Sequence, residues 1–382
     1  MTASNAQLAL MIPTYRWDAL AKDTLTQAAA IGSDEILVHI GDNSANPEKH
    51  AFLKALAERS TNVFVSCHPT NIGADSNWLH LIKAQTTPYV CMAADDDSFI
   101  AAYFRTGLAL VRDDPNCATA SGLHVSIAHG ESNGTVVNTP SERLEASPLE
   151  RIRNYSGQNS ICYAISPRPV IRDFARYVEV NPLQCPFNDY MLAFHLLSMG
   201  TYRMDRKGYV YLYDNSNWQL NDTFIESNAR WYKGYDLPGS FAYLTRLHWA
   251  VVAVHFFSST FRAKNLADDQ ATAIIAYLFD RQRKEFATDY KRYRPAINAV
   301  FKGHAEASAA LRRLMSNKYQ HIAAIFDDFA IVVALFSPDV AARYRAFQTA
   351  SLQPHADGIN APALSNVFFA KAKRMVEQAF ER

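Results

Sequence analysis

The sequence has no excess of charge of either sign and no long apolar run. Its 382 residues include 38 Lys and Arg against 37 Asp and Glu, a formal net charge of +1. Nucleic-acid-binding proteins usually carry a clear basic excess, so this balance argues against that class. The longest apolar stretch of the C-terminal half, 247–257, is interrupted by His248 and His255 and is shorter than the ~20 residues of a membrane-spanning helix. We expect a buried helix there, with both histidines in the core because no third metal ligand accompanies them.

Cysteines are few, and no pair of them has the spacing of a metal site. The count of five is odd, and Cys91, Cys117 and Cys162 lie in apolar, strand-like runs. This predicts reduced thiols in a cytosolic core rather than a disulfide framework. The polar segment 1–7 has no basic start followed by an apolar block, so we expect no signal peptide and a cytoplasmic protein.

The first two hundred residues alternate between short apolar strands and helical patterns. We expect strands at 8–12, 35–40, 62–66 and 89–93, with helices at 17–30, 48–59 and 74–85 between them. This order predicts an α/β fold with a mixed, mostly parallel sheet flanked by helices. In such sheets, ligands bind beyond the carboxyl ends of the strands.

The rest of the chain changes from strands to helices. Strands are expected at 119–128, 135–137, 160–165, 202–205 and 209–213, and a helix at 189–199 stops at Gly200. From about residue 223 the pattern is almost wholly helical, with helices expected at 243–257, 268–290, 305–326, 338–350 and 364–380. The length and the 49% apolar composition suffice for two domains. We therefore predict a first domain at 1–222 and a C-terminal all-helical region at 223–382.

Three adjacent carboxylates, Asp95, Asp96 and Asp97, follow the apolar strand at 89–93. At the exit of a buried strand they repel one another strongly unless they share a cation. Hard divalent ions such as Mg²⁺ and Mn²⁺ prefer carboxylate oxygens and keep positions open for phosphate oxygens. A metal here would bridge the two phosphates of a nucleotide diphosphate. The plainer interpretation is an acidic turn or cap before a helix that starts at Ala101, but the position after the fourth strand favours the metal.

Further polar turns follow the other strands of this sheet. Asp42 ends the second strand, where its carboxylate suits a uracil N–H or a ribose hydroxyl, although Asp-Asn-Ser is also an ordinary turn. Pro13, Thr14 and Tyr15 end the first strand, and the tyrosine ring could stack on a base. The segment 71–77 leads into a helix, and its backbone N–H groups suit a phosphate or a base edge.

Together these motifs resemble the nucleotide-binding half of family-2 glycosyltransferases with the GT-A fold. Enzymes of that family are inverting, use nucleotide-diphospho-sugars and usually need Mn²⁺ or Mg²⁺. The likeness covers roughly residues 7–215, and it implies a UDP-, GDP- or dTDP-linked sugar as donor. It assigns donor binding to Pro13, Thr14, Tyr15, Asp42, Asn71, Gly73, Asn77, Asp95 and Asp96. It assigns metal binding to Asp95 and Asp97, with Asp97 as the main ligand.

The family also places an acidic pair at the start of a later helix, and the second acid serves as the catalytic base. The match here is Asn188-Asp189, so the resemblance implies that Asp189 takes the proton from the acceptor hydroxyl. Asn188 departs from the commoner acid, and Asp189 is equally well placed as a helix N-cap. By the same likeness Gly157 and Asn188 border the sugar and the acceptor. Trp218 could stack on a sugar ring, although an aromatic residue in a loop is more often simply packed.

The resemblance therefore implies metal-dependent, inverting transfer of a sugar to a glycan or lipid-linked acceptor, in polysaccharide, lipopolysaccharide or other glycan biosynthesis. A sugar nucleotidyltransferase is one alternative, but it would want a Gly-rich, basic phosphate loop after the first strand, and residues 13–16 contain no glycine. A non-catalytic, nucleotide-sugar-binding scaffold is another. The presence of Asp95, Asp97 and Asp189 argues against it.

The last expected helix, 364–380, carries apolar residues toward one side and basic residues among the rest. Such a helix can lie on an anionic membrane, which would place the protein at the inner face of the membrane. More often it packs its apolar stripe on its own domain, and we favour that outcome. A homodimer is a further partner that the sequence leaves open.

Overall fold

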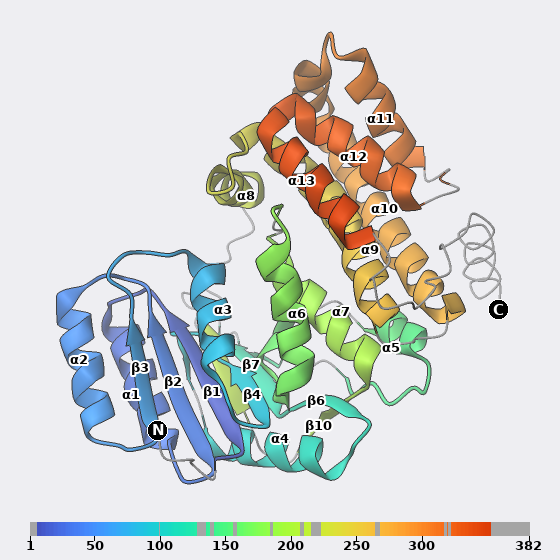
Figure 1. The fold of residues 1–382 in the computed structure, drawn as a ribbon. Coiled ribbons are helices and arrows are strands. Elements are labelled where there is room, and N and C mark those ends of the chain that lie inside the picture. The colour runs from blue at the N-terminus through green and yellow to red at the C-terminus, as the bar shows by residue number, and fades with distance from the viewer. Residues whose placement is uncertain are drawn as a thin grey trace. The chain divides into compact units, whose positions relative to one another are not determined.

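The computed structural model describes residues 6–98, 100–127, 135–137, 141–155, 159–183, 186–206, 210–214, 223–263, 268–316, 319 and 322–352. The chain divides into two compact units (Figure 1). The first comprises Met1–Arg176 and Leu192–Gln219, and the second comprises Tyr177–Met191 and Leu220–Arg382.

The first unit is built on a five-stranded sheet in the order β3-β2-β1-β4-β9. Its strands are β1 (Leu8–Thr14), β2 (Ile36–Asp42), β3 (Val63–Cys67), β4 (Tyr89–Met92) and β9 (Ser166–Pro167). The first four pair with one another in parallel, and β9 pairs antiparallel with β4. The predicted mixed, mostly parallel sheet is therefore confirmed.

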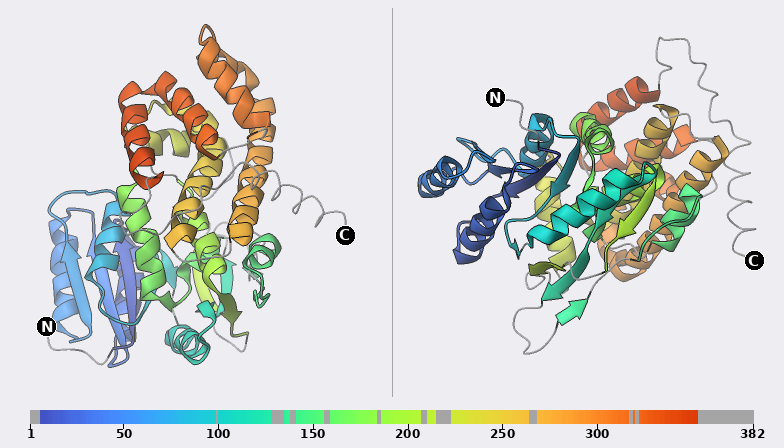
Figure 2. Two further views of the ribbon diagram at one scale, coloured as in Figure 1. Left: turned by 45° about the vertical axis from the view of Figure 1, so that its right-hand side comes forward. Right: turned by 90° about the horizontal axis from the view of Figure 1, so that it is seen from below.

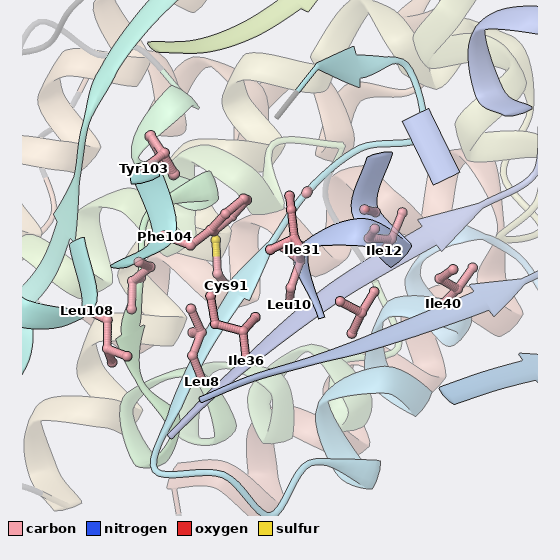
Figure 3. Close-up of a cluster of buried hydrophobic side chains, with 14 of the residues drawn as sticks. Leu8, Leu10, Ile12, Ile31, Ile36, Ile40, Cys91, Tyr103, Phe104 and Leu108 are labelled. Carbon is pink, nitrogen blue, oxygen red and sulfur yellow. The ribbon is translucent and has the colours of Figure 1, made fainter. Parts of the chain in front are cut away.

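Helices cover both faces of this sheet. They are α1 (Ala19–Ile31), α2 (Pro47–Glu58), α3 (Ala74–Ala84) and α4 (Ala101–Asp113). Alternate residues of β1 and β2, such as Leu10 and Ile40, point into one core with α1, α2 and α4 (Figure 3). The opposite face is covered by α3, which lies in front of the strands in Figure 1 and approaches β2 closely at Gly41. This burial on both faces explains why the strands read as continuous apolar runs.

The rest of the first unit adds two smaller sheets. One pairs β6 (Cys117–Ser121) with β10 (Thr201–Met204) in parallel. The other has the order β5-β11-β7-β8, with β5 (Asp97–Ser98), β7 (Leu123–Ile127), β8 (Thr135–Val137) and β11 (Val210–Asp214). The short helix α5 (Pro148–Asn154) precedes a 3₁₀ helix at Asn159–Tyr163.

Two predicted strands of this region are wrong in detail. The run at 160–165 forms the 3₁₀ helix, closed by an Ala164 N–H bond to the Ile161 carbonyl, and only Ile165 bridges to Ala120. A short buried apolar run does not by its pattern distinguish strand from helix, which is the cause of the error. The run at 119–128 is not one strand either, because β6 and β7 join different sheets on either side of Gly122.

Two helices connect the units. The helix α6 (Arg168–Val180) was not predicted from the sequence. Its second residue is Pro169, and proline fits the first turn of a helix. The helix α7 (Asn188–Met199) lies where a helix was expected. Within the second unit, the ring of Tyr177 lies 4.7 Å from that of Phe256 and the ring of Phe187 lies 4.8 Å from that of Trp249. These contacts group 177–191 with the helical unit, whereas the sequence-based boundary places that segment in the first domain.

The second unit is helical in its described residues. Its helices are α8 (Thr223–Lys233), α9 (Thr245–Ala263), α10 (Asp268–Phe301), α11 (Ala305–Ser316), α12 (Ile322–Phe336) and α13 (Pro338–Leu352), with a 3₁₀ helix at Gly239–Leu244. The long helices α9 and α10 run side by side in both views (Figures 1 and 2), and α10 is kinked at Tyr293, two residues before Pro295.

The predicted single helix at 305–326 is wrong, because α11 ends at Ser316 and α12 begins only at Ile322. The sequence between them is polar, and the two helices pack on each other with an Arg313–Asp328 pair, Nε to Oδ2 3.0 Å. The expected helix at 364–380 lies outside the described residues. No helix among the residues that the structure describes is long and apolar enough to cross a membrane.

The cysteines and histidines singled out in the sequence are core residues. The thiols of Cys91, Cys117 and Cys162 are free and buried, as predicted, and Cys67 is free and exposed. On α9, both His248 and His255 are buried. The imidazole of His248 donates from Nε2 to the Leu183 carbonyl (3.2 Å), which leaves Nδ1 to accept from the Tyr232 hydroxyl (2.9 Å). The prediction of core histidines is therefore confirmed.

Acid should destabilise the protein through its buried histidines. Burial lowers the pKa of His248 to about 3, against a smaller opposing effect of its hydrogen bond to Leu183. Since the unfolded chain keeps a pKa near 6.5, it binds the proton first. The stability due to neutral His248 is complete above pH 6.5 and is lost as the pH falls toward 3, by about 1.4 kcal/mol per pH unit.

Urea unfolding between pH 7 and pH 4.5 checks this expectation. We expect His248→Gln to flatten the pH dependence of the free energy of unfolding, and His304→Gln, a change at an exposed histidine, to leave it unchanged. If the free energy of unfolding of the His248→Gln variant depends on pH as steeply as that of the wild-type chain, His248 is not a source of the pH dependence.

Candidate active site at the carboxyl edge of the sheet

The sheet brings several of the predicted site residues to one edge. The parallel pairing of β1 and β2 sets Thr14 opposite Asp42 in the last register position, and β4 ends beside them, just before the acidic triplet. Carboxyl ends of parallel strands share one edge, which is where ligands bind in sheets of this kind.

Asp95 holds the turn that follows β1. Its Oδ2 accepts from the Thr14 hydroxyl (2.6 Å) and from the backbone N–H groups of Tyr15 (3.0 Å) and Arg16 (3.1 Å). These three donors fix the orientation of the Asp95 carboxylate. Asp95 is buried, whereas the Tyr15 ring above this turn is 60% exposed. The turn is thus held to the segment after β4 by three hydrogen bonds, and its aromatic side chain is exposed.

Asp42 lies at the centre of a second group of polar contacts and is fully buried. It accepts from Lys49 Nζ at 2.8 Å, and its Oδ2 lies 2.9 Å from His50 Nε2 and 2.8 Å from the Ser44 hydroxyl. The Lys49 ammonium also donates to Thr14 Oγ1 at 2.7 Å. In the described structure Asp42 is therefore an internal ion-pair partner, and its predicted contact with a nucleoside stays a prediction.

Asp96 and Asp97 face different partners. Asp96 Oδ2 pairs with Arg16 at 2.9 Å, and the same guanidinium bonds Asp18 at 2.8 Å. Burial raises the pKa of the Asp96 carboxyl, as does neighbouring Asp95, while Arg16 opposes the rise. Asp97 is nearly buried in β5, with Oδ2 3.3 Å from the Ala94 N–H. The triplet is therefore not a freely solvated acidic turn.

The third polar turn lies between β3 and α3. Asn71 accepts from Gly73 N–H (2.9 Å) and from Asn43 Nδ2 (2.8 Å), and Asn43 in turn accepts from the Ile72 N–H. Gly73 has φ +88°, a conformation that favours glycine. Asn77 is buried and donates to the Gly41 carbonyl at 2.7 Å, so it fastens α3 to β2. The residues before the N-terminus of α3 are exposed, and their predicted contact with a phosphate or a base edge stays a prediction.

The remaining predicted residues lie elsewhere. Asp189 is in the first turn of α7, where its Oδ1 accepts from the Tyr190 N–H at 2.8 Å. It belongs to the second unit, and the acidic triplet belongs to the first. Asn188 begins α7, and its Nδ2 has no hydrogen-bond partner among the described residues. Gly157 and Trp218 lie outside the described residues.

Sequence reasoning missed Lys49, Arg16 and Asn43. The sequence contains a signal for Lys49, because it lies four and seven residues before Leu53 and Leu56, the buried side chains of α2. A lysine in the apolar stripe of an amphipathic helix is expected to be buried, and a buried lysine is expected to pair with a buried carboxylate. Arg16 and Asn43 carry no comparable signal, since each follows a strand as an ordinary polar turn residue.

The oxygen donors at this edge suit a divalent cation. No three His, Cys, Asp or Glu side chains lie close enough to hold a metal among the residues described here. Mg²⁺-type sites usually take only one or two carboxylates and complete their shell with water and substrate phosphates. The assignment of Asp95 and Asp97 as the carboxylates of such a site stays a prediction from the sequence.

Comparison with solved structures gives similar folds. One is S. aureus TarS 1–349 in complex with UDP-GlcNAc, with TM-score 0.45, 12% identity, and coverage of 98% of this chain and 92% of that one. Another is the mannosyltransferase PcManGT from Pyrobaculum calidifontis in complex with GDP-Man and Mn²⁺, with TM-score 0.43, 12% identity, and coverage of 91% and 87%. Neither protein-family models nor curated proteins give a match. The likeness concerns the fold alone.

Proposed function

We propose that the chain is a glycosyltransferase that binds a nucleotide-diphospho-sugar at the carboxyl edge of the main sheet and transfers its sugar with inversion. The observation that carries this proposal is the meeting of Thr14, Asp42 and the acidic triplet at that edge, beside the exposed ring of Tyr15. Aromatic stacking, hydrogen-bond acceptors and carboxylates are the groups that a nucleoside diphosphate with its cation requires.

In this proposal each part of the edge has one task. Tyr15 stacks on the base, and the Asn71–Gly73 turn with the N-terminus of α3 offers N–H groups to the donor. Asp95 and Asp97 hold a Mn²⁺ or Mg²⁺ ion, which when bound would offset negative charge on the diphosphate. Arg16, held between Asp96 and Asp18, adds a second positive charge at the same edge.

Asp189 is the residue we propose as the base. A single displacement at the anomeric carbon needs one carboxylate to take the proton of the attacking hydroxyl. In the structure the Asp189 carboxylate lies at the start of α7 and is half-buried. The acceptor we propose is a hydroxyl of a glycan or of a lipid-linked sugar, and the cytoplasmic location and the membrane contact of 364–380 stay predictions from the sequence.

A hydrolysis and transfer assay tests the proposal. The full-length chain is incubated with UDP-, GDP- and dTDP-sugars, with Mn²⁺ and with EDTA, and released nucleotide is measured. We expect release from one class of donor that depends on the metal. Pyrophosphate release from a sugar 1-phosphate and a nucleoside triphosphate would instead indicate the nucleotidyltransferase. Binding of a donor with no turnover in the presence of varied acceptors would favour the non-catalytic scaffold.

A further inference from the structure

Lys49 occupies a position where a lysine is rarely found. It is fully buried in α2, and it continues the stripe formed by Leu53 and Leu56. Lysine is almost never fully buried unless it is paired. An apolar residue at this position would complete the stripe, so packing of α2 does not explain why the residue is charged.

The hydrogen bonds of Lys49 run in one direction. An ammonium only donates, so Thr14 Oγ1 must accept from Lys49 Nζ (2.7 Å). The single hydroxyl proton of Thr14 is then given to Asp95 Oδ2 (2.6 Å). Lys49 also donates to Asp42 Oδ1 (2.8 Å). One buried cation thus joins Asp42, at the end of β2, to Asp95, beyond the end of β4, through the hydroxyl at the end of β1.

Stability alone does not account for this arrangement. Apolar residues of similar volume often replace a buried ion pair at no cost, so such a pair is weak evidence for a stabilising role. The pair lies at the edge of the sheet where ligands bind. It connects Asp95, a proposed metal ligand, with Asp42, which the family resemblance assigns to the nucleoside. Groups that orient metal-ligating side chains typically contribute roughly 10–100-fold in metal affinity or activity.

We propose that Lys49 is a positioning residue for the donor, acting through Asp42 on the nucleoside side and through Thr14 on the Asp95 side. The inference rests on the proposed function. Its consequence is that loss of the ammonium weakens the binding of nucleotide and metal together. Asp42 loses its ion-pair partner, and Thr14, which donates to Asp95, loses the donor that orients its hydroxyl.

Lys49→Met tests this role against Lys54→Met, a change of an exposed lysine on the same helix. Isothermal titration with UDP and GDP in the presence of Mn²⁺ gives the affinity, and initial rates give KM and kcat per folded molecule. We expect Lys49→Met to weaken nucleotide affinity and raise the donor KM by on the order of tenfold, with a smaller change in kcat. Lys54→Met is expected to match the wild-type chain.

If Lys49 contributes only to folding, a different result is expected. Unfolding of part of the sample would lower the number of active molecules and leave the donor KM and the affinity of the folded fraction unchanged. That outcome for Lys49→Met would overturn the inference. If the wild-type chain itself binds no nucleotide, the proposed function fails, and the two failures are thereby distinguished.

Should Lys49→Met not fold, Thr14 offers a second test. Thr14→Val removes the hydroxyl between Lys49 and Asp95 and leaves the Lys49–Asp42 pair in place, whereas Thr14→Ser keeps the hydroxyl. We expect Thr14→Val to raise the donor KM and weaken Mn²⁺-dependent nucleotide affinity, and Thr14→Ser to recover most of the loss. Equal affinities for Thr14→Val and the wild-type chain would contradict the proposed connection.

Discussion

Asp97→Asn is expected to remove most transfer activity and most metal-dependent nucleotide affinity while the fold is retained. The carboxylate follows the fourth parallel strand, and the substitution keeps its size and an oxygen that can accept from Ala94 N–H. A lost metal ligand should lower turnover by about 10²-fold or more, because charge stabilisation by a bound cation contributes several kcal/mol. Calorimetric titration with UDP and GDP, with and without Mn²⁺, measures the effect.

The control for this change is Asp23→Asn, which alters an exposed carboxylate on α1. It should leave both affinity and turnover unchanged. Unaltered Mn²⁺-dependent nucleotide affinity in the Asp97→Asn variant would remove this residue from the metal site and leave Asp95 as the carboxylate to test next.

Asp189→Asn is expected to lower the transfer rate by roughly 10²–10⁴, the range for loss of a general base. Asparagine cannot take a proton, but its oxygen can still accept from the Tyr190 N–H, so stability should change little. Donor affinity should persist, since the residues proposed to hold the nucleotide belong to the first unit. Steady-state rates and donor titrations of the purified variant test these two expectations separately.

The configuration of the product adds a test of the mechanism. One base and one displacement give one inversion at the anomeric carbon, which NMR of the product shows directly. Glu226→Gln, a change at an exposed acid of α8, serves as the control with normal turnover. Near-normal turnover of Asp189→Asn would exclude it as the base, and a product of retained configuration would refute the inverting mechanism.

The parallel sheet could be predicted from the sequence because each strand is a short apolar run followed by a polar turn. The register of β1 and β2 then determines that Thr14 and Asp42 end at the same edge. Because the succession of strands along the chain and the position of the acidic triplet after the fourth strand follow from these patterns, the location of the candidate site was predictable from local signals.

The partners of the site residues were not predictable in the same way. The bond from Lys49 to Thr14 joins residues 35 positions apart, and that from Thr14 to Asp95 spans 81. Such contacts depend on how α2 packs on the sheet, which periodicity does not specify. The 3₁₀ helix at Asn159–Tyr163 was missed for a related reason, since burial makes its residues apolar whether they form a strand or a helix.

We propose that the carboxyl edge of the main sheet binds a nucleotide-sugar donor with a divalent cation. The most direct test is thermal unfolding of the full-length chain with UDP, GDP, dTDP and their sugar conjugates, each with Mn²⁺, with Mg²⁺ and with EDTA. A ligand that binds the native state raises its melting temperature. We expect a rise for one class of nucleotide that is larger with metal than with EDTA, and we expect Asp97→Asn to lose the part that depends on metal. No rise with any of these nucleotides at millimolar concentration, with metal or without it, would contradict the claim.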